Sequence, residues 1–236
     1  MSDTRTRDYF ESFTPHYAPE RFEFAIRFLQ QHGAPDQALL DVGCGDGATM
    51  YQIARRTPLH RLTGLDLSGK YLRKARDLVA CETLEGSILD EETLDRVHGR
   101  YDYCTLGAVL HHVVGKTRRE SYRLATRCLA NAARALKPGG YLMVFEPTHG
   151  PAWLMTVLFW VKRLVGSLVS GRLEILSRWA NIGRPVVSYY TPDQLQRMFD
   201  NIGSLRVVHT EKVDESRMGF LIRRVGLGIV LQKKPD

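Results

Sequence analysis

The feature that most constrains the fold is a glycine turn, Asp41-Val42-Gly43-Cys44-Gly45-Asp46-Gly47, set between an apolar run and a helical stretch. The apolar run is Ala38-Leu39-Leu40, and residues 48–54 follow with helical character. A strand therefore ends in a turn that opens a helix. Glycine lets the backbone reach positive φ and approach a ligand closely, and a helix N-terminus offers unpaired N–H groups. The pattern predicts a cradle for a nucleotide-type ligand.

Three kinds of nucleotide site compete for this turn. A Walker-type phosphate loop needs Gly-Lys followed by Ser or Thr, and no lysine stands between Gly43 and Lys70. The dinucleotide fingerprint is met in its looser form by Gly43, Gly45 and Ala48, so NAD stays an alternative. The Asp41 carboxylate beside the glycines suits an ammonium group and repels a pyrophosphate. Charge therefore favours a ligand that ends in an amino acid.

The whole D-x-G-x-G-x-G string resembles the first motif of the class I S-adenosylmethionine (SAM) methyltransferases of the small-molecule type. Four further segments match that family in order: Arg61–Ser68, Leu84–Asp90, Tyr101–Val113 and Ala135–Glu146. The resemblance covers residues 38–146. It implies an α/β fold, Rossmann-like and doubly wound, with a mostly parallel seven-stranded sheet and an antiparallel C-terminal hairpin. We expect the hairpin at Leu205–Val213 and Gly226–Gln232.

Length and composition fit one domain with additions. Of the 236 residues, we expect 1–37 to form an N-terminal helical cap or lid and 38–236 to form the methyltransferase domain, with a helical insertion at 151–187. Strands that alternate with helical stretches favour a parallel sheet covered on both faces. The four cysteines show no C-x-x-C spacing, which argues against a metal site and for a reducing, cytoplasmic location. No secretory segment opens the sequence.

The resemblance implies a set of cofactor-binding residues. Asp41 is expected to meet the amino group of SAM, and Asp66, about 20 residues after the glycines, its ribose hydroxyls. Leu67 is expected to pack on the adenine, and Ser87 and Ile88 to meet the adenine amino group. The full predicted set is Asp41, Gly43, Cys44, Gly45, Asp66, Leu67, Ser87, Ile88, Leu106 and, from the N-terminal cap, Tyr17.

The best candidates for a base or an orienting group are His111 and His112. They follow the fourth strand, whose carboxyl end faces the crevice of an open α/β sheet, and histidine titrates near neutral pH. The alternative is that both are hydrogen-bonding loop residues. The resemblance also suggests that Tyr17, or Tyr9, latches onto His111 over the cofactor. Further candidates on the acceptor side are Glu146, His149, Tyr189 and Tyr190, although packing is the stronger interpretation of the two tyrosines.

A small-molecule acceptor fits better than nucleic acid. Leu106-Gly107-Ala108 stands where amino-directed DNA and RNA methyltransferases carry Asn/Asp-Pro-Pro-Tyr, and no Pro-Cys pair occurs. The net charge of +7 comes from dispersed residues, which is also what a solvated basic surface gives.

The insertion carries an apolar run at 152–161, followed by Lys162-Arg163. This run is too short to span a bilayer. Three interpretations compete: a lid over the acceptor, a dimer face, or a segment that contacts a membrane surface through 152–170. The lid is favoured, and monomer and homodimer both stay open.

The predicted function is transfer of the methyl group of SAM to an O, N or C atom of a small molecule, with release of S-adenosylhomocysteine, as in secondary metabolite biosynthesis. One alternative uses SAM itself as substrate for intramolecular cyclisation or aminocarboxypropyl transfer, with release of methylthioadenosine. A second is a non-enzymatic SAM-binding or membrane-docked subunit. An NAD-linked dehydrogenase rests only on the loose glycine match.

Overall fold

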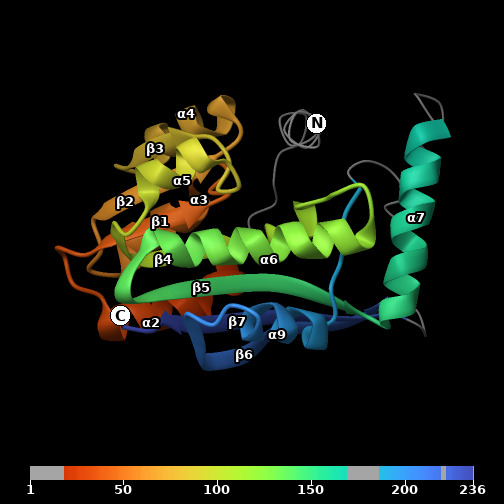
Figure 1. Cartoon of the computed structure of the whole chain (residues 1–236). Helices are drawn as coiled ribbons and strands as arrows, with labels where there is room; N and C mark the ends of the chain where they lie inside the picture. Colours follow the sequence, from red (N-terminus) through yellow and green to blue (C-terminus); the bar gives the residue numbers. More distant parts are fainter. Residues whose placement is uncertain (1–18, 169–185, 219–221, 236) are drawn as a thin grey trace.

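One seven-stranded sheet, with helices on both of its faces, organises the described part of the chain (Figure 1). The computed structural model describes residues 19–168, 186–218 and 222–235. The strands are β1 Ala38–Val42, β2 Arg61–Asp66, β3 Glu82–Glu85, β4 Tyr101–Gly107, β5 Leu136–Gly150, β6 Leu205–Met218 and β7 Ile222–Lys233, in the order β3-β2-β1-β4-β5-β7-β6. Neighbours from β3 to β5 pair in parallel, and β7 runs antiparallel to both β5 and β6.

This order confirms the predicted fold class, including the antiparallel C-terminal hairpin. The hairpin is longer than expected, because β6 continues to Met218 and β7 begins at Ile222. β6 is an edge strand that pairs only with β7, and its second half carries many charged residues. Exposed edge strands favour charged side chains, so the apolar alternation that marks a strand in the sequence is missing there.

Two layers of helices bury the two faces of the sheet. The helices are η1 Pro19–Phe22, α2 Glu23–His32, α3 Ala48–Arg56, α4 Gly69–Leu78, α5 Glu91–Val97, η2 Leu110–His112, α6 Arg118–Ala135, α7 Ala152–Leu168 and α9 Pro192–Asp200. Side chains of α5, α6 and α9 form one apolar core with the sheet, and those of η1, α2, α3 and α4 form the other. The result is the three-layer arrangement expected for a parallel sheet.

The predicted site residues gather where the strand order reverses. β1 lies between β2 and β4, so the connections that leave β1 and β4 depart on opposite sides of this point. All five residues of β1 are buried, as expected for a central parallel strand. Ligands of open α/β sheets bind beside the carboxyl ends of the strands at such a reversal. The glycine turn after β1 and the His111 loop after β4 therefore meet at one edge.

The described part of the predicted N-terminal cap packs into a core. Phe22 of η1 and Phe24 of α2 are buried, and the Phe22 ring covers Gly107 at the end of β4. Tyr9 and Tyr17, the two candidate latch residues, lie outside the described residues. The proposed latch on His111 therefore stays a prediction.

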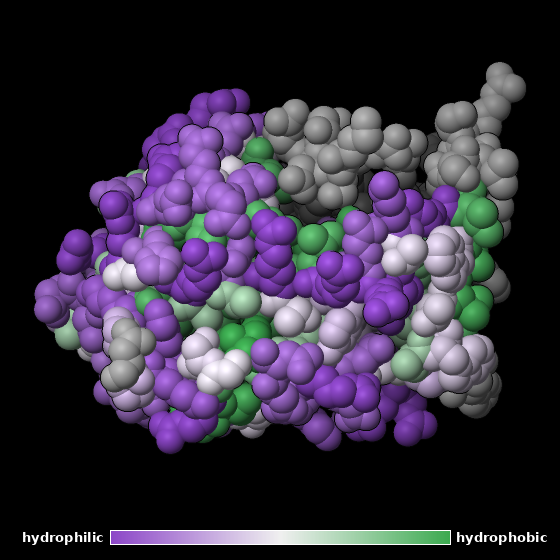
Figure 2. Space-filling view, in the orientation of Figure 1, coloured by the Kyte–Doolittle hydropathy of each residue, from purple (hydrophilic) through white to green (hydrophobic). Residues whose placement is uncertain are grey.

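α7 lies within the predicted insertion and packs against β5. Its inward face buries Met155 and Phe159, while its outward face exposes an apolar stripe (Figure 2). The stripe consists of Trp153, Val157, Trp160, Val161 and Leu164. Among the described residues, no helix combines the length and apolarity needed to cross a membrane. The lid, dimer and membrane-surface interpretations of this segment stay predictions.

Candidate active site

The glycine turn after β1 adopts backbone conformations that favour glycine. Gly43, Gly45 and Gly47 have φ of 72°, 55° and 83°. The N–H groups of Gly43 and Cys44 both donate to the carbonyl oxygen of Leu65 on β2, at 2.7 and 3.2 Å, which fixes the turn. Among the described residues, no atom beyond Gly45 and its two neighbours in the chain lies within 4 Å of the position that a Cβ on Gly45 would occupy. The turn therefore leaves open space beside Gly45, as a cradle for a ligand requires.

The carboxylate of Asp41 is buried close to this space. Asp41 is only 3% exposed, and the hydroxyl of Thr105 donates to its Oδ1 at 2.7 Å. Burial raises the pKa of Asp41 to about 7, the Thr105 hydrogen bond opposes the rise, and the nearby charge of Asp66 adds to it. No lysine or arginine of the described residues forms an ion pair with Asp41. A cationic ligand would supply the missing counter-charge.

Cys44 directs its side chain away from the cradle. Its sulfur lies 2.7 Å from the position that a Cβ on Gly64 would occupy, so it packs against β2. The Cys44 side chain is buried, and burial raises the pKa of its thiol, so the thiol stays neutral. Cys44 therefore offers a ligand no thiolate, and its backbone N–H is already bound to the Leu65 carbonyl.

Asp66 ties the end of β2 to the glycine turn. Its Oδ2 accepts the N–H of Gly45 at 3.0 Å, and its Oδ1 accepts the N–H of Ser68 at 2.9 Å. Ser68 is the N-cap of α4, because its hydroxyl accepts the N–H of Tyr71. Leu67 lies between them and is half-buried. The predicted pair Asp66 and Leu67 thus borders the same turn as Asp41.

The loop after β3 is held by hydrogen bonds from within and from α6. The Ser87 hydroxyl accepts the N–H of Leu89 at 3.2 Å, and the side-chain amide of Asn131 donates to the Ile88 carbonyl at 2.8 Å. The Ile88 carbonyl therefore already has a donor from the protein. Leu106, near the end of β4, is fully buried. Sequence reasoning missed Asn131, since a polar residue inside a helix gives no local signal of a contact 43 residues away.

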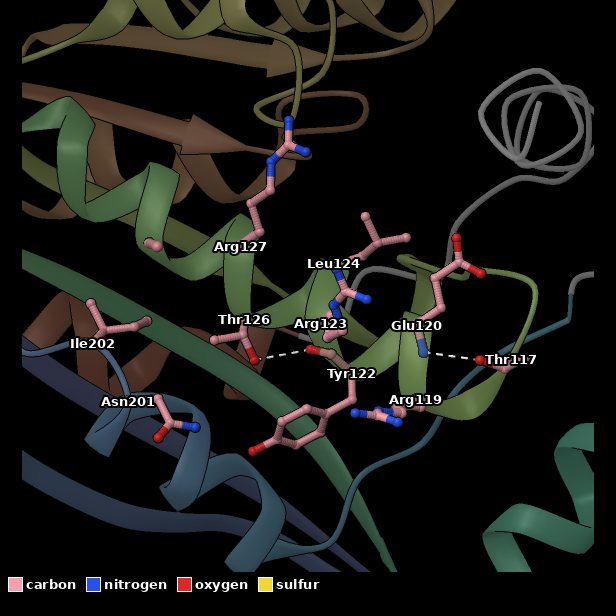
Figure 3. A pocket seen from close by; sticks show the side chains of 11 residues that line it. Thr117, Arg119, Glu120, Tyr122, Arg123, Leu124, Thr126, Arg127, Asn201 and Ile202 are labelled. Carbon is pink, nitrogen blue, oxygen red and sulfur yellow. Dashed lines mark hydrogen bonds between the residues drawn. The ribbon is translucent and has the colours of Figure 1, made fainter.

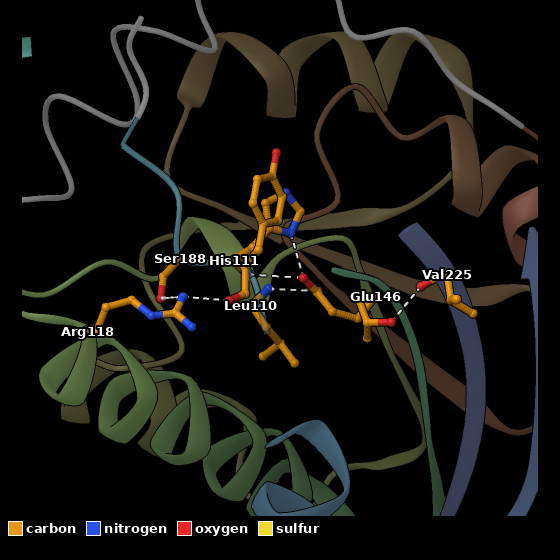
Figure 4. Close-up of polar contacts among 8 residues, drawn as sticks. Leu110, His111, Arg118, Glu146, Ser188 and Val225 are labelled. Atoms are coloured by element: carbon orange, nitrogen blue, oxygen red, sulfur yellow. Dashed lines mark hydrogen bonds and ion pairs between the residues drawn. The ribbon is translucent and has the colours of Figure 1, made fainter. Parts of the chain in front are cut away.

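The most distinctive pair of the site joins the η2 loop to β5 (Figure 4). The Nδ1 atom of His111 lies 2.5 Å from Oε1 of Glu146. The two carboxylate oxygens of Glu146 also accept the backbone N–H groups of Leu110 and His111, each at 3.2 Å. Glu146 is fully buried and His111 is 6% exposed. Glu146 therefore fixes both the η2 backbone and the orientation of the His111 ring.

Burial changes the protonation of both members of this pair. It raises the pKa of Glu146 to about 8, against the opposing effect of the two backbone donors. It lowers the pKa of His111 to about 3, together with the charges of Arg21, Lys162 and Arg224. Because the carboxylate and the imidazole are in direct contact, the uptake of a proton is a property of the pair and not of either residue alone. Above about pH 8 the pair is a carboxylate with a neutral imidazole, whose Nδ1–H points to Glu146 and whose Nε2 is free of a proton.

Tyr189 links His111 to His149. The Tyr189 ring centroid lies 5.3 Å from that of His111 and 4.0 Å from that of His149. The His112 ring also packs on His111, with the two ring centroids 4.0 Å apart. Tyr190 instead points into the core and is 1% exposed. The structure therefore brings four predicted side chains together and places Tyr190 in a packing position.

Two residues that sequence reasoning missed hold the segment of Tyr189 in place. The N–H of Ser188 donates to the His111 carbonyl at 2.9 Å. The guanidinium of Arg118, at the start of α6, donates to the Ser188 hydroxyl at 3.2 Å and to the Tyr189 carbonyl. Neither contact leaves a sequence signal, because Arg118 and Ser188 are 70 residues apart.

An open groove of about 1100 Å³ lies elsewhere, on the outer side of α6 beside the end of α9 (Figure 3). It is lined by Thr117, Arg119, Glu120, Tyr122, Arg123, Leu124, Thr126, Arg127, Ala130, Asn201 and Ile202. None of the predicted site residues is among them. The hydrogen bonds drawn there, from the Glu120 N–H to Thr117 and from the Thr126 hydroxyl to the Tyr122 carbonyl, are internal to α6 and its cap. Within the described residues, no group of side chains suited to hold a metal ion occurs.

Comparison with known proteins gives one family match and several relatives. A family profile described as "Methyltransferase domain" matches residues 39–140. The ribosomal RNA small subunit methyltransferase C of Escherichia coli O7:K1 is 30% identical over 106 residues, which is 45% of this chain and 30% of that protein. The chain thus spans about a third of the length of such curated relatives.

Solved structures share the fold over most of the chain. The geranyl diphosphate C-methyltransferase of Streptomyces coelicolor A3(2) superposes with a TM-score of 0.61 at 15% identity and covers 98% of each chain. The [4+2]-cyclase SpnF superposes with a TM-score of 0.63 at 16% identity and covers 92% of this chain and 82% of its own. These likenesses confirm the predicted fold. The same fold occurs in proteins whose names state different reactions.

Proposed function

We propose that the chain transfers the methyl group of SAM to a small molecule, on the basis of the match of residues 39–140 to a methyltransferase-domain profile and of the sheet order. The observation that carries the proposal is the buried Asp41 carboxylate beside the open space at Gly45. A buried carboxylate without a cationic partner favours an ammonium-bearing ligand. It disfavours the pyrophosphate of NAD, whose charge has the same sign.

The residues of the cradle fit SAM. Asp41 would hold its amino group, the backbone of the Gly43–Gly45 turn its amino-acid moiety, and Asp66 its ribose hydroxyls. Leu67 and the Ser87–Ile88 loop would border the adenine. When bound, SAM supplies a methyl group that is already electrophilic, because it is attached to a positively charged sulfur. The protein must therefore position the acceptor, exclude water and, for a protonated acceptor, take up a proton.

His111 is the residue suited to take up that proton. Its Nδ1 is engaged by Glu146, so Nε2 is the nitrogen that can accept a proton from an acceptor hydroxyl or N–H group. The buried carboxylate then faces an imidazolium and stabilises it, as orienting carboxylates do in other histidine-dependent sites. Tyr189 and His149 would border the acceptor next to this ring. This division of roles also makes Glu146 a positioning residue rather than a group that touches the acceptor.

All four cysteines of the chain are free. A reducing compartment keeps thiols in this state, and we therefore propose a cytoplasmic location. RNA is the competing acceptor, because relatives named ribosomal RNA methyltransferases match the same region.

One assay tests the reaction. The purified chain is incubated with SAM and either pooled metabolites or total RNA, and the sulfur-containing product is identified by mass spectrometry. S-adenosylhomocysteine formed with metabolites alone supports the proposal. Methylthioadenosine would indicate cyclisation or aminocarboxypropyl transfer instead of methyl transfer. S-adenosylhomocysteine formed only with RNA would show that the acceptor is RNA and not a small molecule. The absence of any turnover would favour a SAM-binding subunit without enzymatic activity. Asp41→Asn should abolish turnover, whereas Asp36→Asn, at an exposed position outside the cradle, should not.

A further inference from the structure

Lys162 occupies an unusual place for a lysine. It lies on the inward face of the mostly apolar helix α7, with Met155 and Phe159, and is only 7% exposed. No hydrogen bond or ion pair joins it to any described residue. Lysine is almost never buried without a partner, and burial lowers the pKa of Lys162. Such a position is costly for the fold, which suggests that Lys162 serves a ligand.

The charge of Lys162 acts on the catalytic pair. It lowers the pKa of both His111 and His112, so its ammonium lies within electrostatic reach of these two rings. Arg21 of η1 and Arg224 of β7 act on His111 in the same way. Three cationic side chains from three separate elements therefore disfavour a positive charge on His111.

Among the described residues, the acidic groups near His111 do not neutralise all three of these cationic side chains. The Glu146 carboxylate is engaged by His111 and two backbone N–H groups. Asp214 pairs with Arg224 at 3.1 Å. Neither Lys162 nor Arg21 has a carboxylate partner among the described residues, and the Arg21 guanidinium lies over the Phe145 ring. A surplus of positive charge is left beside the pair.

The sheet register places Arg224 beside His149, on the proposed acceptor side. His149 of β5 is directly opposite Arg224 of β7, and neighbouring cross-strand residues share one face of a sheet. The His149 ring contacts Tyr189, which in turn stacks on His111. The row from Arg224 to His111 is therefore continuous, and α7, which carries Lys162, packs against the same strand β5.

We propose that the methyl acceptor carries an anionic group, a carboxylate or a phosphate, and that Lys162 binds this group with Arg21 beside the His111–Glu146 pair. This inference rests on the proposed function, since it names the substrate class of that site. An anion there would restore the counter-charge that Lys162 lacks and hold the acceptor next to Nε2 of His111. A lysine suits this role because its ammonium is a compact point charge with three donors.

The test uses inorganic phosphate and acetate as probes, so that it does not depend on knowing the acceptor. The full chain is labelled with ¹⁵N-lysine and saturated with S-adenosylhomocysteine, and the side-chain resonances are titrated against pH with and without each anion. The Lys162 resonance is assigned with Lys162→Met, and the exposed Lys116, assigned with Lys116→Met, is the matched control. We expect a saturable rise in the Lys162 pKa of about one unit, because a nearby anion favours the charged form. An unresponsive Lys162, or an equal shift of Lys116, would overturn the inference.

Stability and cofactor binding separate the remaining possibilities. Lys162→Met should keep or raise the melting temperature, since it removes a buried amine that has no partner. It should leave the affinity for S-adenosylhomocysteine within about twofold and weaken phosphate binding at least about tenfold, as expected for loss of one charged contact. A clear drop in melting temperature would assign Lys162 to the fold and contradict the inference. Failure of the parent chain to bind S-adenosylhomocysteine would instead count against the proposed function.

Discussion

The Nδ1 atom of His111 and the Oε1 atom of Glu146 lie 2.5 Å apart, although the two residues are separated by 35 positions in the sequence. His111 follows β4, and Glu146 lies in β5, the parallel neighbour of β4. The sheet therefore brings a histidine and a buried carboxylate together at the edge where the glycine turn also ends. This contact orients the His111 ring and commits one of its nitrogens to the protein, as the proposed role of His111 as a base requires.

The first prediction concerns the pH dependence of turnover. Because burial raises the pKa of Glu146 to about 8, the pair retains its extra proton below that pH, and Nε2 of His111 is then a poor base. We expect the rate for a hydroxyl or N–H acceptor to rise with pH, with a midpoint near 8. The profile of kcat against pH under saturating SAM measures this. A rate that is flat from pH 6 to 9, with chemistry shown to be rate-limiting, would contradict the role of the pair.

The second prediction is that Glu146→Gln changes the shape of this profile as well as its height. Glutamine keeps the size of the side chain but cannot stabilise an imidazolium, so we expect the maximal rate to fall about 100-fold or more. The limb near pH 8 should disappear, because the group that shares the proton is gone. The affinity for S-adenosylhomocysteine should stay unchanged. A purely structural role would lower the rate without removing the limb.

The third prediction tests the open space at the glycine turn. A methyl group at position 45 would enter this space, so Gly45→Ala should weaken binding of S-adenosylhomocysteine at least about tenfold, roughly the effect of 1.4 kcal/mol. Gly99→Ala is the matched control: Gly99 has φ of 65°, close to the 55° of Gly45, and nothing lies within 4 Å of its Cβ position either. Both variants should lose a similar 1–2 kcal/mol of stability from left-handed strain. Equal binding by the two variants would show that the space at Gly45 does not receive the ligand.

The fourth prediction concerns Thr105, whose hydroxyl donates to Asp41. This hydrogen bond lowers the pKa of Asp41 against the effect of burial. Thr105→Val should therefore raise the pKa of Asp41 above about 7 and shift the pH dependence of cofactor binding upward. Thr57→Val removes another buried hydroxyl, which donates to the Ile53 carbonyl on α3, and should leave the pH dependence of cofactor binding unchanged. Calorimetric titrations of both variants across pH 6 to 9 give the comparison.

The sequence permitted prediction of the fold because each class I motif is local. Asp41, Gly43 and Gly45 stand within one turn, and Asp66 closes the next strand, so the order of motifs along the chain predicted the order of strands. The proposed cofactor side of the site rests on the same local patterns, because each of its residues stands in a motif that can be identified by itself.

The acceptor side was less predictable because it depends on contacts between distant residues. His111 and Glu146 were both named from the sequence, but nothing local indicates that they pair. Lys162 was interpreted only as the basic end of an apolar run. Since α7 carries apolar residues on both its buried and its exposed faces, its sequence does not reveal which way a single lysine points. That orientation is fixed only when the helix packs against β5.

The most direct test of the account is the affinity for S-adenosylhomocysteine at pH 8 and pH 6, measured by calorimetry on the parent chain and on Asp41→Asn. With an Asp41 pKa of about 7, the ionised fraction falls about tenfold between these pH values. We predict an about tenfold weaker affinity at pH 6 for the parent chain, and a weak, pH-independent affinity for the variant. Tight binding of NADH in place of the sulfur nucleoside, or equal affinity of parent and variant at pH 8, would contradict the claim that Asp41 receives an amino group.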